Sequence, residues 1–249
     1  MSPQQRQPRG FTLIELMVSM AIGSILLLAA AVLLGSSGDN YERISGGVAA
    51  EREARALITR FTSDLSAATF HKDGVFEQST TSWPADRIGF LSLQPSEAQS
   101  DAGRIGDLCA VSYYLKDLPI NGNSIRCLMR GFRESKDTFD ALGNDSIPSL
   151  FAPQGGIDEP VAFGVVSFEA RPKSRDPSGK WIDWVPNDIT APEALETRLV
   201  VARRALAARL KTTADWDGSA LLGTPAEAGR NKDLEIFSAL IRFGNHEKP

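Results

Sequence analysis

The stretch that decides the fold of this chain lies at residues 8–34, which read PRGFTLIELMVSMAIGSILLLAAAVLL. A short basic leader ends at Gly10, and Phe11 opens an apolar run that continues to Leu34. As a helix, this run would be about 36 Å long. The hydrocarbon core of a bilayer is about 30 Å thick, so the run predicts a membrane-spanning helix with some tilt.

The apolar run contains one ionisable side chain, Glu15, near its start. A charge inside a membrane helix costs roughly 2.5–3.5 kcal/mol on insertion scales, and such residues commonly mark functional sites. If the chain is cut after Gly10, the new ammonium of Phe11 lies four residues from Glu15, on the same helix face. The amine of a neighbouring copy could pair with Glu15 as well. The alternative is a tolerated polar side chain that reaches the membrane interface.

Charges on the two sides of the run predict its orientation. Arg6 and Arg9 precede it, and the next Lys or Arg is Arg43. The positive-inside bias places the N-terminus in the cytoplasm and the remaining chain outside. A secretory signal peptide would have a shorter apolar core, although residues 29–31 could pass for its cleavage site. A plain signal anchor would explain the length and the arginines but not Glu15.

The sequence RGFTLIEL at residues 9–16 resembles the class III signal of type IV prepilins and type II secretion pseudopilins, and the resemblance covers about residues 6–34. It implies that a prepilin peptidase cuts between Gly10 and Phe11, that Phe11 becomes N-methylated and that Glu15 serves filament assembly. It also implies three partners: this peptidase, the inner membrane and homologous pilin or pseudopilin subunits.

The composition is that of an ordinary globular protein of 249 residues, with 42% hydrophobic and 23% charged residues. This length allows one sizeable domain beyond the helix. The formal net charge is −4. Loss of residues 1–10 removes two of the 27 basic residues and no acid, so 25 stand against 31 acidic residues, which gives −6. An acidic protein has no general attraction to nucleic acid, which is therefore not an expected partner.

Beyond the apolar run, glycines at residues 35–47 predict a break or bend, because glycine costs about 1 kcal/mol against alanine in a helix. A helical apolar stripe then resumes, and Arg60 and Asp64 are assigned to the other faces. The stripe consists of Ile44, Val48, Ala54, Ile58, Phe61, Leu65 and Ala68. We expect a leader at 1–10, a transmembrane and filament-core helix at 11–34, an amphipathic continuation at 35–70 and a globular domain at 71–249.

The globular part carries strand-like patterns at 87–93, 109–116, 124–133, 161–171, 196–202 and 234–243. Residues 121–123 predict a hairpin with a longer loop. Residues 205–211 are read as a short helix or a strand end, and 94–107, 134–160, 172–192 and 212–232 as loops. The pattern predicts a pilin-like α+β fold, with the long helix packed on a mostly antiparallel sheet. In its size the chain is similar to larger family members such as the minor pilin PilW and the pseudopilin PulJ, also called GspJ.

The two cysteines, Cys109 and Cys127, could form a disulfide in an exported domain. The predicted hairpin favours buried thiols instead, because Cys109 lies 13 residues before Gly122 and Cys127 only 5 after it. Antiparallel partners lie at nearly equal distances from a turn. No Cys or His spacing indicates a metal site, and residues 215–218 are read as a capped turn rather than a calcium loop. We expect no cofactor.

Enzyme signatures such as Gly-x-Ser-x-Gly, a Walker loop or His-Glu-x-x-His do not occur, so no enzymatic activity is predicted. A basic and aromatic cluster at residues 171–184 is interrupted by acids and is read as a solvated loop. The predicted function is that of a minor pilin or pseudopilin in the inner membrane, single-pass with a periplasmic domain, and then in a filament. The alternative is a filament-tip subunit that captures DNA, a surface or a secretion substrate.

Overall fold

The computed structural model describes residues 13–95, 105–186 and 190–244, with side chains at 13–32 and from residue 54 onward in these ranges. Gly10 and Phe11, the predicted cleavage and methylation residues, lie outside the described residues. Contacts divide the chain into two compact units, Met1–Ser45 and Gly46–Pro249.

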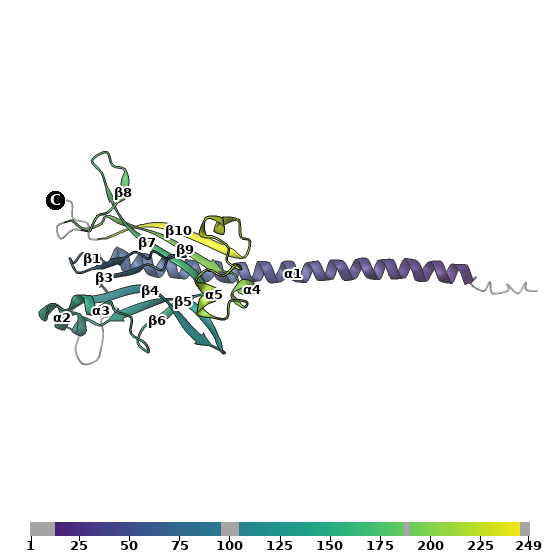
Figure 1. Cartoon of the computed structure of the whole chain (residues 1–249), viewed down its shortest axis with the longest axis horizontal. Coiled ribbons are helices and arrows are strands. Elements are labelled where there is room, and N and C mark those ends of the chain that lie inside the picture. The colour runs from purple at the N-terminus through teal and green to yellow at the C-terminus, as the bar shows by residue number, and fades with distance from the viewer. Residues whose placement is uncertain (1–12, 96–104, 187–189, 245–249) are drawn as a thin grey trace, which may run out of the picture. The chain divides into compact units, whose positions relative to one another are not determined.

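Helix α1 runs from Leu13 to Ser66 and belongs to both units (Figure 1). The break that the glycines at residues 35–47 predicted is not present, because the helix is continuous there. Each glycine weakens the helix by about 1 kcal/mol, but the strong helix formers on both sides of this stretch support it.

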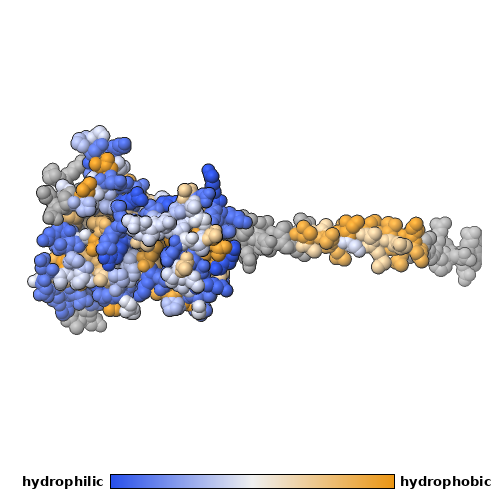
Figure 2. Space-filling model, viewed as in Figure 1, coloured by the Kyte–Doolittle hydropathy of each residue, from blue (hydrophilic) through white to orange (hydrophobic). Residues whose placement is uncertain are grey.

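The first part of α1, Leu13–Val32, is long and apolar enough to cross a membrane, judged by length and composition. Its large side chains are open to the surroundings, for example Leu13 with 76% and Leu27 with 73% of its surface exposed. Figure 2 shows this segment as a nearly continuous hydrophobic surface. An apolar surface of this extent needs lipid or protein around it.

The second unit contains two antiparallel sheets, which confirms the predicted α+β class but divides the expected sheet in two. The first sheet has the order β1-β3-β4-β5-β6, and β2 also pairs with β3. The strands predicted at 87–93, 109–116 and 124–133 are confirmed as β3, β4 and β5. The strands of this sheet are β1 Ala68–Thr69, β2 Val75–Glu77, β3 Arg87–Leu93, β4 Leu108–Ile120, β5 Asn123–Arg133 and β6 Glu159–Phe163.

The second sheet has the order β10-β9-β7-β8. Its strands are β7 Val165–Arg175, β8 Trp181–Asp183, β9 Ala194–Ala202 and β10 Leu234–Arg242. The prediction of one strand at 161–171 is wrong, since β6 and β7 lie in different sheets with Gly164 between them. Gly164 has a φ of 70°, a left-handed conformation that glycine adopts at no steric cost.

The hairpin of β4 and β5 has a tighter turn than predicted. Ile120 pairs with Asn123, so the loop consists of Asn121 and Gly122 alone. Their φ angles are 51° and 79°. Two positive φ angles define the type I′ turn, for which Asn-Gly is the preferred sequence. Asn123 is a poor strand former, which is why the sequence suggested a longer loop.

Short helices occupy two stretches that were predicted to be loops. The sequence of α2 did not predict a helix, because the residues that it buries are small and give little hydrophobic periodicity. Residues 204–207 confirm the short-helix alternative. The helices are α2 Ser135–Gly143, α3 Ile147–Leu150, α4 Arg204–Ala207, α5 Thr213–Trp216 and the 3-10 helix η1 Pro225–Arg230.

The main core lies where the last turns of α1 meet both sheets. Its helix side consists of Ala54, Leu57, Phe61 and Leu65. These side chains contact Ile88, Val111, Tyr113 and Leu128 of the first sheet and Phe168, Leu195, Leu199 and Ile241 of the second. Ala54, Phe61, Leu65 and Ala68 of the predicted stripe are therefore buried, as their helical spacing predicted, whereas the side chains of Ile44 and Val48 lie outside the described residues. A second core around Trp83 and Trp216 covers the other face of the second sheet.

Candidate functional site: the N-terminal helix and its attachment

Glu15 lies in the first turn of α1, exposed on the helix surface. A negative charge near a helix N-terminus interacts favourably with the helix dipole, typically by about 0.3–1 kcal/mol. The two serines of the segment donate their hydroxyls to the helix's own carbonyls: Ser19 to the Glu15 oxygen at 2.5 Å and Ser24 to the Met20 oxygen at 2.8 Å. Glu15 is thus the one strongly polar side chain in Leu13–Val32.

Asp64 attaches the C-terminal end of α1 to the first sheet. The sequence assigned this residue to an outer helix face, and that assignment is wrong, because the side chain is fully buried. Two hydrogen bonds from Arg130, Nε at 2.8 Å and Nη2 at 3.2 Å, hold its carboxylate. The Tyr113 hydroxyl donates at 2.6 Å and Gln94 Nε2 at 2.9 Å. Periodicity alone cannot reveal a buried acid whose basic partner lies on a distant strand.

The environment of Asp64 fixes the protonation of its phenol partner. Burial, together with the Asp64 carboxylate, raises the pKa of Tyr113 well above its ordinary value of 10.0. The hydroxyl therefore remains a proton donor to the carboxylate. The arginine is only 2% exposed, so the ion pair lies in the interior, where loss of one partner leaves an uncompensated charge.

A second Tyr–Asp–Arg group lies on the opposite face of the same two strands. Asp158 accepts a hydrogen bond from Tyr114 at 2.6 Å, from Arg133 Nη1 at 2.6 Å and from the Gln154 backbone N–H at 2.7 Å. Burial alone would raise the pKa of Asp158, but these hydrogen bonds outweigh burial and lower the pKa below its ordinary value. This group fixes the segment before β6 and is structural in character.

The cations of the basic and aromatic cluster are largely paired with acids. Arg175 stacks on Trp181 at 4.6 Å from the ring centroid. Trp184 is buried and donates its Nε1–H to the Thr190 carbonyl at 3.0 Å. The ion pairs are Arg171–Glu169 at 3.3 Å, Lys173–Asp183 at 2.6 Å, Lys173–Glu196 at 2.8 Å and Arg175–Glu193 at 3.8 Å. The cluster therefore offers little free positive charge to a nucleic acid.

Residues 215–218 comprise the last two residues of the short helix α5 and the turn that follows it, with Asp217 at the C-cap position. Thr212 and Asp215 make a reciprocal capping box at α5, and Asp215 also accepts the Lys211 N–H at 3.0 Å. Asp217 accepts a hydrogen bond from Arg126 Nη2 at 2.6 Å. Both carboxylates thus serve the local structure.

Cys109 and Cys127 are both buried thiols. Cys109 pairs with Ser92 of β3, and Cys127 pairs with Lys116 of β4. Cys109 lies seven residues before Lys116, the partner of Cys127, so the two positions are about 23 Å apart along β4. A disulfide needs Cα atoms within about 7 Å. The strand register therefore does not support a bond between the two cysteines.

Comparison with known protein families finds a match at the N-terminus of the chain. Residues 5–31 match the family model described as the prokaryotic N-terminal methylation motif. The matched segment contains Gly10, Phe11 and Glu15, together with most of the exposed apolar helix that begins at Leu13. A search of curated proteins finds no match to the chain. The N-terminal segment of this chain therefore carries the prokaryotic N-terminal methylation motif, and in this segment it is similar to proteins with the class III signal of pilins and pseudopilins.

Proposed function

We propose that this protein is a minor pilin or pseudopilin, cut by a prepilin peptidase and assembled through its N-terminal helix into a type IV pilus or a type II secretion filament. The observation that carries the proposal is the methylation motif at residues 5–31, together with the exposed apolar side chains of the helix segment Leu13–Val32. The motif belongs to structural subunits, so the proposed role is not enzymatic.

In the proposed processing step, the peptide bond between Gly10 and Phe11 is cleaved and the new amine of Phe11 is methylated. Arg6 and Arg9 leave with the leader, while the apolar helix remains part of the mature chain. The amine stays positively charged after methylation. Phe11 precedes Glu15 by four residues, a spacing that would put both on one face of a helix, and the helix of a neighbouring subunit can offer its own amine to the same carboxylate.

The pairing of Glu15 with a Phe11 ammonium gives the carboxylate a function in an apolar environment. An isolated charge in a fibre core or a membrane is costly, and breaking a buried pair typically costs about 3–5 kcal/mol. In this proposal the helix first anchors the subunit in the inner membrane, with residues 1–10 in the cytoplasm and the globular unit in the periplasm. The same helix later packs among other subunits in the filament.

Capture of DNA at a filament tip is not favoured, because Arg171, Lys173 and Arg175 already have acidic partners. Lys180 is exposed, but one lysine beside Asp176 makes no continuous basic surface.

Glu15→Ala tests the proposal. The variant should insert into the membrane as well as the natural chain, because its helix is more apolar, but its level in sheared filaments should fall severalfold. Ser19→Ala is the matched control, since the Ser19 hydroxyl donates to the backbone carbonyls of Glu15 and Leu16 in its own helix. Equal amounts of the Glu15 and Ser19 variants in filaments would argue against a role of the carboxylate in assembly.

A further inference from the structure

A surface groove lies between β2 of the first sheet and the segment that follows β8 of the second. It has a volume of about 380 Å³. Val75 and Phe76 of β2 form one wall, and Trp184 and Pro186 form the other. Val185, between Trp184 and Pro186 in the chain, is also exposed, with 74% of its surface open.

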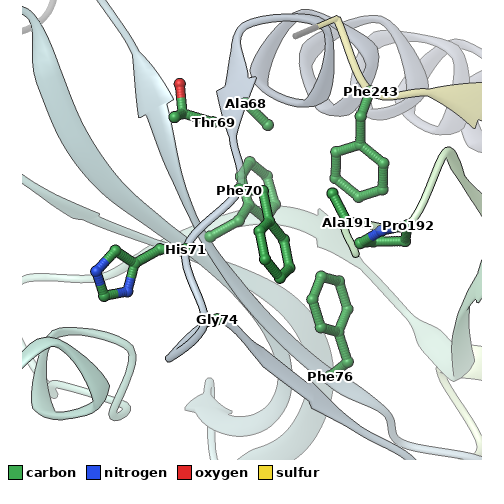
Figure 3. A pocket seen from close by; sticks show the side chains of 10 residues that line it. Ala68, Thr69, Phe70, His71, Gly74, Phe76, Ala191, Pro192 and Phe243 are labelled. Atoms are coloured by element: carbon green, nitrogen blue, oxygen red, sulfur yellow. The ribbon is translucent and has the colours of Figure 1, made fainter. Parts of the chain in front are cut away.

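An aromatic cluster supports this groove from inside. Figure 3 shows the rings of Phe70, Phe76 and Phe243 converging with Pro192, while the imidazole of His71 points away. The ring centroids of Phe76 and Trp184 lie 5.7 Å apart, and those of Phe76 and Phe243 6.5 Å apart. The space left among these rings is only about 20 Å³, room for roughly one water molecule. The cluster is therefore packed, and a ligand has room only in the groove outside it.

The backbone of β2 offers a second kind of contact. Among the described strands, β2 pairs with β3 alone, through Val75, Phe76 and Glu77. Its other edge therefore carries backbone groups without a strand partner. An extended peptide can add to such an edge through main-chain hydrogen bonds, while adjacent apolar pockets receive alternate side chains.

The charges of the groove favour one sign of ligand. Glu77 is bound by Arg87 through two hydrogen bonds, of 2.9 and 2.5 Å. Lys72 also lines the groove, is exposed and has no ion-pair partner among the residues that the structure describes. The charged group that remains available to a ligand is therefore the Lys72 ammonium, and a carboxylate complements it.

We propose that this groove receives an extended segment of a partner protein, which pairs with the edge of β2, lays an apolar side chain against the outer faces of Phe76 and Trp184 and places a carboxylate beside Lys72. The inference concerns the globular unit and does not depend on Glu15 or on leader processing. It assigns the subunit a peptide-docking surface of its own.

The test uses the full chain in lipid nanodiscs and a displayed library of random octapeptides, with empty nanodiscs removing lipid binders. Selected peptides should combine alternating apolar residues with Asp or Glu. Lys72→Glu should weaken their binding roughly fivefold, the size expected for an exposed ion pair. Lys180→Glu, an equal charge change outside the groove, should leave binding unchanged. Replacing the peptide's acid by Lys should restore binding to the Lys72→Glu variant.

N-methylation of alternate peptide amides tests the strand pairing and should abolish binding in one of the two registers. The proposal is overturned if no peptide is enriched over empty nanodiscs or if the Lys72 and Lys180 variants weaken binding equally. It is also overturned if octanoate displaces the peptides while both N-methylated forms bind as well as the parent. That result would indicate a site for small apolar molecules.

Discussion

At the residue scale, two buried acids with the same kinds of hydrogen-bond donors illustrate how this fold uses charge. Asp64 and Asp158 both lie in the interior, and each has an arginine and a tyrosine as hydrogen-bond donors. Such pairs contribute little net stability when intact, because burial of the charges offsets their attraction. Their importance is geometric, because Asp64 fixes one helix end against one position on β5.

Replacing Arg130 by Met should therefore be strongly destabilising, because Asp64 keeps its burial but loses two donors. We expect a loss of about 3–5 kcal/mol in the free energy of unfolding of the second unit. All four tryptophans lie in that unit, so urea unfolding of the nanodisc-bound chain can be followed by their fluorescence. The exposed Arg171→Met is the control and should cost less than about 1 kcal/mol. A similar small loss for Arg130→Met would show that the buried pair is dispensable.

The pH dependence of stability should differ between Asp86 and Asp158. Burial raises the pKa of Asp86 above 3.8, although N–H groups of Ala170 and Ser79 partly oppose this. Its folded state holds the proton more tightly, so its contribution is present below pH 3.8 and is lost as the pH rises through the raised pKa. For Asp158 the lowered pKa gives the reverse: its contribution is present above 3.8 and is lost as the pH falls.

The free energies of unfolding of Asp86→Asn and Asp158→Asn, measured between about pH 3 and 7, test the direction of these two pH dependences. Relative to the natural chain, Asp86→Asn should gain stability as the pH rises, and Asp158→Asn should lose it. Parallel curves for the two variants would contradict the assigned environments.

At the element scale, the sequence predicted what local pattern can encode. The strand-like residues 87–93 predicted β3 with its observed ends, and the stripe that includes Phe61 and Leu65 predicted the face of α1 that packs inward. Tertiary contacts decided the rest. The burial of Asp64 depends on Arg130, 66 residues away along the chain, and α2 lacks a strong apolar stripe because it buries Ser135 and Thr138. The change of sheet after β6 depends on the backbone of a single glycine.

Gly164 is therefore the element-scale test. An alanine at this position would have to adopt a left-handed backbone conformation, which costs about 1–2 kcal/mol. Its Cβ would lie 3.4 Å from the Ala202 carbonyl oxygen. Gly164→Ala should lower the free energy of unfolding by that amount or slightly more. Gly143→Ala, at the end of α2 with open space around the new methyl, should be neutral or stabilising. Equal stabilities of the two variants would mean that the turn between the sheets tolerates a side chain.

At the scale of the whole molecule, the chain combines an exposed apolar helix with a separately cored α+β unit. The two parts suit different surroundings. The apolar residues 13–32 suit lipid or other protein, and the mostly polar surface of the second unit suits water (Figure 2). A filament subunit that starts in a membrane requires both. In the proposed account, the chain would be cut between Gly10 and Phe11, which both lie within the matched motif.

The most direct test is the N-terminal mass of the protein extracted from membranes and from sheared filaments of the producing bacterium. The account predicts a chain that begins at Phe11, carries one added methyl group on its amine and retains the whole apolar helix. Deletion of the peptidase should leave residues 1–10 attached and should empty the filament fraction. An intact leader in assembled filaments, or a chain cut after residue 31, would contradict the prepilin account.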